Sequence, residues 1–116
     1  MVKLESLKKS NQFRKVLKEK KIHTDYFSIF ASKNFFKPKY KSSLIISFVM
    51  KKKIGNAVKR NKIRRKLKAS VQKLLKKKGA INMDNTYIVF GKSNAYTQKQ
   101  DVLLPLMEKS FSKFKK

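Results

Sequence analysis

The segment KKKIGNAVKRNKIRRKLK, residues 51–68, limits the possible folds of this chain most. Ten of its eighteen residues are Lys or Arg and none is acidic, yet residues 54–58 in its middle carry no charge. Gly55 permits a sharp backbone turn, and Asn56 is a good N-cap for a following helix. Because the apolar run SSLIISFVM comes just before this segment, we predict a buried strand, a tight turn and a basic helix that begins at Ala57.

The net charge of the chain indicates a negatively charged partner. With 32 basic and 6 acidic residues among 116, the formal net charge is +26, and no Asp or Glu occurs between Asp25 and Asp84. Like charge at this density destabilises a compact fold unless a polyanion neutralises it. Nucleic acid is the first candidate partner and an anionic membrane surface the second. The length and the 41% hydrophobic content fit one domain, residues 1–116.

Several function classes are excluded by what the sequence lacks. Without Cys there is no disulfide, Cys-based zinc site or thiol nucleophile. No apolar run approaches the roughly 20 residues of a membrane span, and the first residues lack the apolar core of a signal peptide, so we expect a cytoplasmic protein. The six carboxylates are scattered, His23 is the single imidazole, and no phosphate-binding glycine loop is present. We therefore predict no catalytic residue and no metal ligand in this polypeptide.

Hydrophobic periodicity predicts an α+β sandwich in which helices pack against a single sheet. Ser10 is the expected N-cap of the first helix, and Thr97 with Gln100 fits a capping box for the last one. Pro105 should kink that last helix or mark a later start. The general rule for parallel strands predicts a right-handed crossover over residues 44–91. Helices are expected at residues 10–21, 57–78 and 97–114, extended segments at 22–33, 42–50 and 86–93, and a loop around Pro38.

The predicted basic helix has two distinct stripes. Its apolar stripe, which includes Ile63, Leu67 and Val71, is needed for the core. A second stripe, offset from the first, concentrates three of the four arginines of a chain that has 28 lysines. Arginine presents a planar fork that binds phosphate in a bidentate manner and stacks on bases, so this stripe is a candidate RNA-binding surface rather than an ordinary solvated face. Its members are Arg60, Asn61, Arg64, Arg65 and Lys68.

Aromatic side chains form a second candidate surface. Alternation along a strand places Tyr26, Ser28 and Phe30 on one face and Phe27 with Ile29 on the other. One set is expected in the core. The other set, near Phe13 of the first helix, could form a stacking platform for single-stranded nucleic acid, although core packing is the more common role for an aromatic residue.

The segment KKIGNAVKRNKIRRKLK resembles the most characteristic segment of the bacterial ribonuclease P protein subunit, a turn followed by an Arg-Asn-Arg motif on a helix. The segments LKKSNQFRKVLK, YFSIFAS, LIISFVM and YIVFGKSNAYT resemble the first helix and the strands of that family in order and spacing. The resemblance covers nearly the whole chain. It implies an αβββαβα fold with a left-handed strand-helix-strand crossover, and a single RNA-binding domain over residues 1–116.

The resemblance also implies a function. The family's members are the non-catalytic protein partners of ribonuclease P RNA, a ribozyme that cleaves the 5′ leader from precursor tRNA with Mg²⁺ held mainly by the RNA. The expected partners are therefore that RNA and the 5′ leader, with no membrane and no DNA. The alternative is a ribosomal or other structured-RNA-binding protein that has no catalytic RNA partner.

By the same resemblance, two sets of residues contact RNA. Lys62 stands where the motif has its second Arg, and Leu17 stands where many members have Phe. The implied leader-binding cleft comprises Phe13, Leu17 and Phe30. The implied RNA-binding residues of the turn and helix are Lys52, Lys53, Asn56, Arg60, Asn61, Lys62, Arg64, Arg65 and Lys68.

Overall fold

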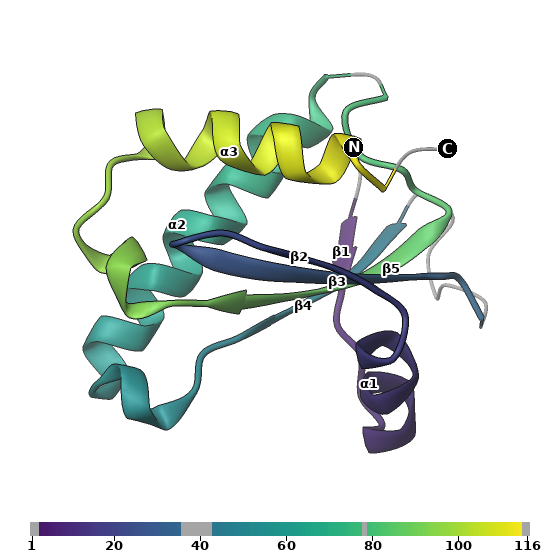
Figure 1. Cartoon of the computed structure of the whole chain (residues 1–116), viewed down its shortest axis with the longest axis horizontal. Helices are drawn as coiled ribbons and strands as arrows, with labels where there is room; N and C mark the ends of the chain where they lie inside the picture. Colours follow the sequence, from purple (N-terminus) through teal and green to yellow (C-terminus); the bar gives the residue numbers. More distant parts are fainter. Residues whose placement is uncertain (1–2, 36–42, 78, 115–116) are drawn as a thin grey trace.

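The apolar runs of the sequence form the centre of a single five-stranded sheet in the computed structural model, which describes residues 3–35, 43–77 and 79–114 (Figure 1). The predicted loop around Pro38 lies outside the described residues. The strands are β1 (Lys3–Glu5), β2 (Lys20–His23), β3 (Phe27–Lys33), β4 (Ser43–Val49) and β5 (Asn85–Gly91). The helices are α1 (Ser10–Leu17), α2 (Ala57–Leu75) and α3 (Gln100–Ser112), with short 3₁₀ helices η1 (Lys52–Ile54) and η2 (Ser93–Tyr96).

The strand order in the sheet is β1-β4-β5-β3-β2. The neighbours β1, β4 and β5 are parallel, whereas β3 is antiparallel to both β5 and β2. The predicted α+β sandwich with helices against one sheet is confirmed. The N-terminal strand β1 was not predicted, because three residues are too short to show a hydrophobic period. Within the described residues, no helix is both long and apolar enough to cross a membrane.

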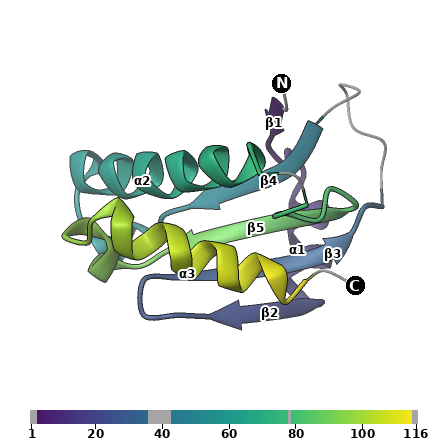
Figure 2. The same cartoon turned by 90° about the horizontal axis from the view of Figure 1, so that it is seen from above.

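The connection from β4 through α2 to β5 is left-handed. Figure 2 views the sheet from the side of α2 and α3; β4 and β5 both point to the left, and β5 lies below β4. A chain that leaves β4, returns in front of the sheet through α2 and then enters β5 turns in the left-handed sense. The right-handed crossover expected from the general rule is therefore wrong, and the left-handed crossover implied by the family resemblance is confirmed.

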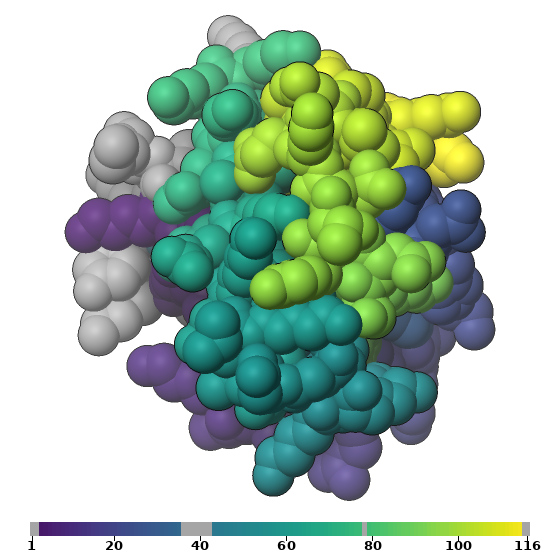
Figure 3. Space-filling view, turned by 90° about the vertical axis from the view of Figure 1, so that its left-hand side faces the viewer, coloured from purple at the N-terminus to yellow at the C-terminus, as the bar shows by residue number. Residues whose placement is uncertain are grey.

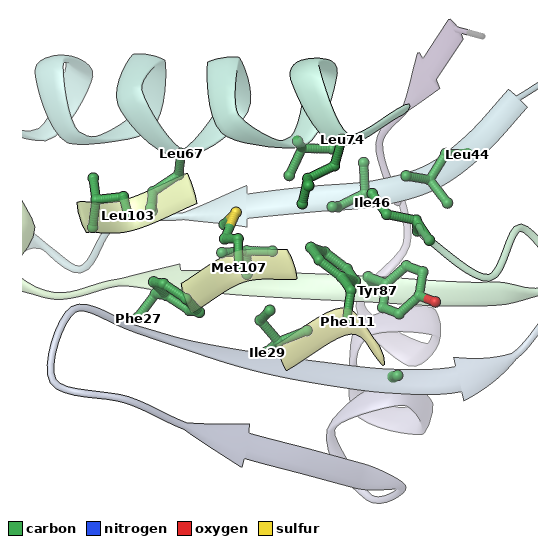
Figure 4. Packing of buried hydrophobic residues seen from close by; sticks show 14 of the residues in the cluster. Phe27, Ile29, Leu44, Ile46, Leu67, Leu74, Tyr87, Leu103, Met107 and Phe111 are labelled. Carbon is green, nitrogen blue, oxygen red and sulfur yellow. The ribbon is translucent and has the colours of Figure 1, made fainter. Parts of the chain in front are cut away.

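The main core fills the space between the sheet and the pair α2 and α3 (Figure 4). From α2 the predicted apolar stripe points into it, and from α3 the side chains of Leu103, Met107 and Phe111 do the same, all fully buried. Phe111 packs edge-to-face on Tyr87 of β5, with ring centres 5.0 Å apart. The sheet contributes alternate residues of its three long strands, among them Phe27, Ile29, Leu44, Ile46, Tyr87 and Val89.

The opposite face of the sheet carries α1 and a smaller core. Val16 of α1 is fully buried against Ile45 and Ile88, with Phe13, Phe30 and Phe90 partly buried around them. Hydroxyl side chains also line the strand positions that face this way, and Ser47 accepts a hydrogen bond at 2.8 Å from the backbone N–H of Leu7. This second face is therefore covered over only part of its area, and by an eight-residue helix.

Two predicted N-caps, Ser10 and Thr97, are wrong. The N-cap of α1 is Lys9, not Ser10, because the Gln12 side chain reaches back and accepts from the backbone N–H of Lys9 at 3.3 Å. The N-cap of α3 is Lys99, not Thr97. The Gln100 side chain forms no capping box with Thr97: its Nε2 donates to the carbonyl of Lys66 at 2.8 Å, and its Oε1 has no hydrogen-bond partner among the described residues.

Pro105 lies inside α3, in its sixth position. The helix starts at Gln100, three residues later than the predicted residue 97 but five residues before Pro105, so the proline does not mark its start. Only the first four N–H groups of a helix lack an intrahelical acceptor. A proline just beyond them removes a single backbone hydrogen bond, so the helix continues through it.

Candidate nucleic-acid interface

The turn that precedes α2 fixes where the basic helix begins. Gly55 has a φ of 154°, a region that favours glycine, and a Cβ at this position would lie 2.9 Å from the Cδ of Lys59. Asn56 is the N-cap, and its Oδ1 accepts the backbone N–H of Lys59 at 3.0 Å. The predicted turn, cap and start at Ala57 are confirmed. Asn56, which the family resemblance places among the RNA-binding residues, therefore has a structural role as well.

One flank of α2 carries the predicted arginine stripe. Arg65, Lys68 and Asn61 are exposed, whereas Arg60 and Arg64 are half-buried. The Nη1 of Arg64 donates to the Oδ1 of Asn61 at 2.7 Å, which orients that guanidinium one turn along the helix. The Nε of Arg60 is buried and has no hydrogen-bond partner among the described residues. No acidic residue occurs in α2, so the positive charge of this flank is not neutralised within the helix.

The other flank of α2 faces η2 and includes Lys62. Lys62 Nζ lies 4.8 Å from the centre of the Tyr96 ring, and Lys59 Nζ lies 5.3 Å from it. Lys59 Nζ also donates to Ser93 Oγ at 2.8 Å. Figure 3 faces this end of the molecule and shows the teal atoms of α2 beside the lime-green atoms that lead into α3. Lys62, grouped by the family motif with the arginines, thus lies on a different side of the helix from the arginine stripe.

Lys66 joins α2 to η2 through backbone groups. Its Nζ donates to the carbonyls of Tyr96 at 2.6 Å, Gln98 at 2.8 Å and Ala95 at 3.3 Å. Burial, followed by repulsion from Lys62, lowers the pKa of Lys66. Lys66 therefore holds the end of η2 against the basic helix, a role that could not be read from the sequence, since charge and spacing do not distinguish it from its neighbours.

A groove of about 690 Å³ opens on the α1 side of the sheet. Leu17 and Phe30, two of the three residues implied for the leader cleft, line it. Phe13 does not line it and instead packs beside Val16 in the smaller core. The other lining residues include Ser28 and Phe90 from the strands, Lys51 and Lys53 from the basic turn, and His23, Ile54, Gly91, Lys92 and Ser93.

The aromatic floor of this groove was predicted in part. Ser28 and Phe30 share its side of β3, as the alternation indicated, and Phe30 packs edge-to-face on Phe90 with ring centres 5.5 Å apart. Tyr26 does not share that face, because it precedes β3 in the hairpin turn and packs against the main core. The same alternation, applied to the run TYIVFG, would have found Phe90.

Gly91 permits the close packing behind the groove. A Cβ at this position would overlap Met50 Sδ and would lie 2.8 Å from the Cγ2 of Ile63. The end of β5 thus lies directly against the strand exit and the basic helix. Through this contact the groove and α2 share one framework, with Lys51 and Lys53 between them.

Both surfaces carry chemical groups that fit a nucleic acid. Within residues 3–35, 43–77 and 79–114, no three His, Asp or Glu side chains come together as metal ligands. An apolar aromatic floor with ammonium groups at its rim fits unpaired bases and their phosphates. A neighbouring arginine stripe fits the phosphate backbone of a folded nucleic acid.

Comparisons with known proteins agree with this arrangement. A family model described as Ribonuclease P matches residues 1–115. The fold is similar to that of the RNase P protein of Staphylococcus aureus, with a TM-score of 0.68 and 22% identity, covering 94% of this chain and 93% of that chain. It is also similar to the RNase P protein of Thermotoga maritima, with a TM-score of 0.69 and 21% identity, covering 97% and 99% of the two chains. A search of curated protein sequences finds no match.

Proposed function

The chain belongs to the Ribonuclease P family, whose role is in tRNA processing, and from this premise we propose that it is the protein subunit that assists a catalytic RNA in removing the 5′ leader of precursor tRNA. The RNA partner binds the turn and the arginine flank of α2. The leader lies in the groove lined by the end of α1, the hairpin of β2 and β3, the end of β5 and the turn of residues 51–54.

One observation carries this proposal: the groove and the basic helix share the segment of residues 51–56. Lys51 and Lys53 line the groove, and Asn56 caps the helix three residues later. A single-stranded segment in the groove would therefore leave it beside the surface that binds the folded RNA. This geometry suits a substrate that is single-stranded at its leader and structured beyond it.

In the proposed division of labour, the protein binds and orients and the RNA performs the hydrolysis. Bound Mg²⁺ would supply an activated water for attack on the phosphodiester. We place these ions on the RNA, since the described part of the chain brings no set of metal ligands together, and the net charge of +26 of the whole chain repels divalent cations. The lysines and arginines lower the repulsion between leader and RNA, so less Mg²⁺ is needed for both to come together.

The test is cleavage of precursor tRNA by the RNA encoded in the same genome, with and without the protein, over a range of Mg²⁺ concentrations. We expect the protein to shift the midpoint to lower Mg²⁺, and to help a substrate with an eight-nucleotide leader more than one with a two-nucleotide leader. Polylysine of equal charge serves as the control for charge alone. If the protein changes neither quantity more than polylysine does, the chain is better explained as a structured-RNA-binding protein without a catalytic partner.

The arginine flank has its own test. Replacing Arg64 and Arg65 with Gln should weaken binding to the partner RNA by about 1–2 kcal/mol for each charge-assisted hydrogen bond that the substitution removes. The control replaces Lys73 and Lys76 with Gln, which removes the same charge from exposed positions at the other end of α2. Affinity is measured at moderate salt by filter binding. Equal losses in the two double variants would mean that charge, not the arginine stripe, determines binding.

A further inference from the structure

His23 and Ser28 form a polar pair inside the groove. They lie directly opposite each other on β2 and β3, and the His23 Nδ1 is 2.6 Å from the Ser28 Oγ. Both residues line the groove. Ser28 is only 5% exposed, so its hydroxyl depends on protein partners for its hydrogen bonds.

This burial assigns the tautomer of His23. A buried hydroxyl proton without an acceptor is unfavourable. Among the described residues, the only hydrogen-bond acceptor for the Ser28 hydroxyl is the His23 Nδ1. Ser28 therefore donates, Nδ1 accepts with its lone pair, and the proton of the neutral imidazole is on Nε2. Nε2 has no hydrogen-bond partner within residues 3–35, 43–77 and 79–114, so it is available as a donor to a ligand.

The hairpin that carries His23 is held in place at its turn. Thr24 Oγ1 accepts the backbone N–H groups of Tyr26 and Phe27, at 3.2 and 3.1 Å. Lys92 Nζ donates to the Thr24 carbonyl at 2.6 Å, which ties the turn to the end of β5. A further tie is the side-chain amide of Asn94, which donates to the carbonyl of Asp25 at 3.2 Å. The backbone beside His23 is thus held in place, and the contact with Ser28 orients the exposed imidazole ring.

The surroundings of the His23 Nε2 distinguish it from the other hydrogen-bond donors in the groove. Phe30 packs edge-on to the His23 ring, with centres 6.0 Å apart, and Phe90 packs on Phe30. Lys51 and Lys53 also line the groove, but their flexible ammonium groups bind any phosphate and do not distinguish bases. The ammonium group of Lys92 is held by the Thr24 carbonyl. The Nε2–H of His23 is a neutral donor of fixed direction beside an aromatic floor.

We propose that His23 is a specificity-determining residue that donates from Nε2 to the N7 of a purine base of the leader, a role that rests on the proposed leader site. Adenine and guanine both carry an N7 acceptor. A two-ring base also covers more of the aromatic floor formed by Phe30 and Phe90, which favours purines in single-stranded sites. Ser28 acts as a positioning residue, since it keeps the proton on Nε2.

The experiment uses the protein assembled with its RNA and a pool of precursor tRNAs whose leader nucleotides are randomised. Sequencing of cleaved and uncleaved molecules gives the base preference at each leader position. We expect a preference for purines at one position, of about five- to tenfold, the size of one hydrogen bond. His23→Phe keeps a ring and removes the donor, so it should abolish that preference. Ser28→Ala should reduce it, and Ser112→Ala, an exposed serine of α3, should leave it unchanged.

A chemical substitution in the substrate checks the contact itself. A 7-deazapurine at the preferred position should cost wild-type protein the same five- to tenfold and should cost the His23→Phe protein nothing further. Thermal unfolding of each variant controls for loss of fold. The inference is overturned if wild type stimulates cleavage of leader-bearing substrates but shows no purine preference, or if His23→Phe retains it. Absence of any leader-dependent stimulation by wild type would instead overturn the proposed function, and this inference with it.

Discussion

The two faces of the sheet differ in how completely they are covered. On one face α2 and α3, of 19 and 13 residues, bury Phe27, Ile29 and Val89 without measurable exposure. On the other face α1 has eight residues and leaves Phe30 and Phe90 half-exposed at a groove. The same two strands, β3 and β5, supply both sets of side chains in alternation. One face therefore provides most of the stability, and the other has aromatic surface left for a ligand.

The helices explain why the faces differ. The covered face receives two helices that together span the long strands, as Figure 1 shows above the sheet. The open face receives only α1, whose last residue, Leu17, is 37% exposed at the edge of the groove. Hydroxyl side chains such as Ser28 and Ser47 stand on this side, where a continuous apolar layer is absent. A chain this rich in lysine concentrates its apolar residues on one face, because it has too few to seal both.

The largest expected effect on stability comes from a substitution on the face covered by α2 and α3. Phe111→Ala should lower the free energy of unfolding by about 3–5 kcal/mol, because it removes a fully buried ring and leaves a cavity against Tyr87. Urea denaturation at high salt measures the change. A loss below about 1 kcal/mol would mean that this face repacks easily and is not the main source of stability.

A rise in pH is expected to have an intermediate effect on the free energy of unfolding. Burial raises the pKa of Tyr87 to about 12, above the usual value near 10 of the unfolded chain. The unfolded state therefore loses its proton first, and the contribution of Tyr87 to stability is present below pH ~10 and lost as pH rises towards about 12. The loss should reach about 2–3 kcal/mol.

Lysine deprotonation changes stability over the same range, so the matched control for this effect is Tyr87→Phe. The comparison is between the two proteins' urea unfolding free energies at pH 9 and pH 11. The wild type should lose more stability than the variant between these values. Parallel pH profiles would show that the Tyr87 hydroxyl, which donates to the Asn82 carbonyl at 2.8 Å, does not hold its proton as burial predicts.

The smallest expected effect on stability is on the open face. Phe30→Ala should reduce the advantage of a long leader by about 2 kcal/mol, the typical contribution of one stacked base, and should lower the free energy of unfolding by only about 1 kcal/mol. Leader binding is measured as the ratio of affinities for substrates with eight- and two-nucleotide leaders. The proposed difference between the two faces would be contradicted if Phe30→Ala lost as much stability as Phe111→Ala and left the leader ratio unchanged.

Local sequence patterns predicted the parts of the fold that depend on neighbours along the chain. The strand at β4, the turn at Gly55, the Asn56 cap and the apolar stripe of α2 all agree with the structure, because each depends on residues within a few positions. The cap of α1 failed through a local competitor, Gln12, but other failed predictions depend on distant partners. Gln100 was assigned to a capping box with Thr97, but its amide binds the Lys66 carbonyl, 34 residues away.

The predictions for the candidate site also succeeded where they depend on local spacing and failed where they depend on distant residues. The arginine stripe was predicted because helical spacing places its members on one flank. The groove was predicted only in part, since Phe90 and His23 reach it from strands that the sequence does not pair. Lys62 and Lys66 show the limit most clearly. Both belong to the same basic run, yet one lies over Tyr96 and the other binds three backbone carbonyls of the segment around η2.

The sequence by itself determined the main helices and strands and the position of the basic helix, because periodicity and turn residues are local properties, and its net charge predicted a polyanionic partner. The tertiary structure decided the left-handed crossover, the separation of the lysines from the arginines, and the meeting of His23 and Ser28 in one groove. These three features depend on which strands pair and which helix covers each face. They are therefore set by contacts between residues far apart in the chain. The segment of residues 51–68 combines the two kinds of feature. Its turn is determined by neighbouring residues, but the direction of its arginines is set by the core beneath the helix.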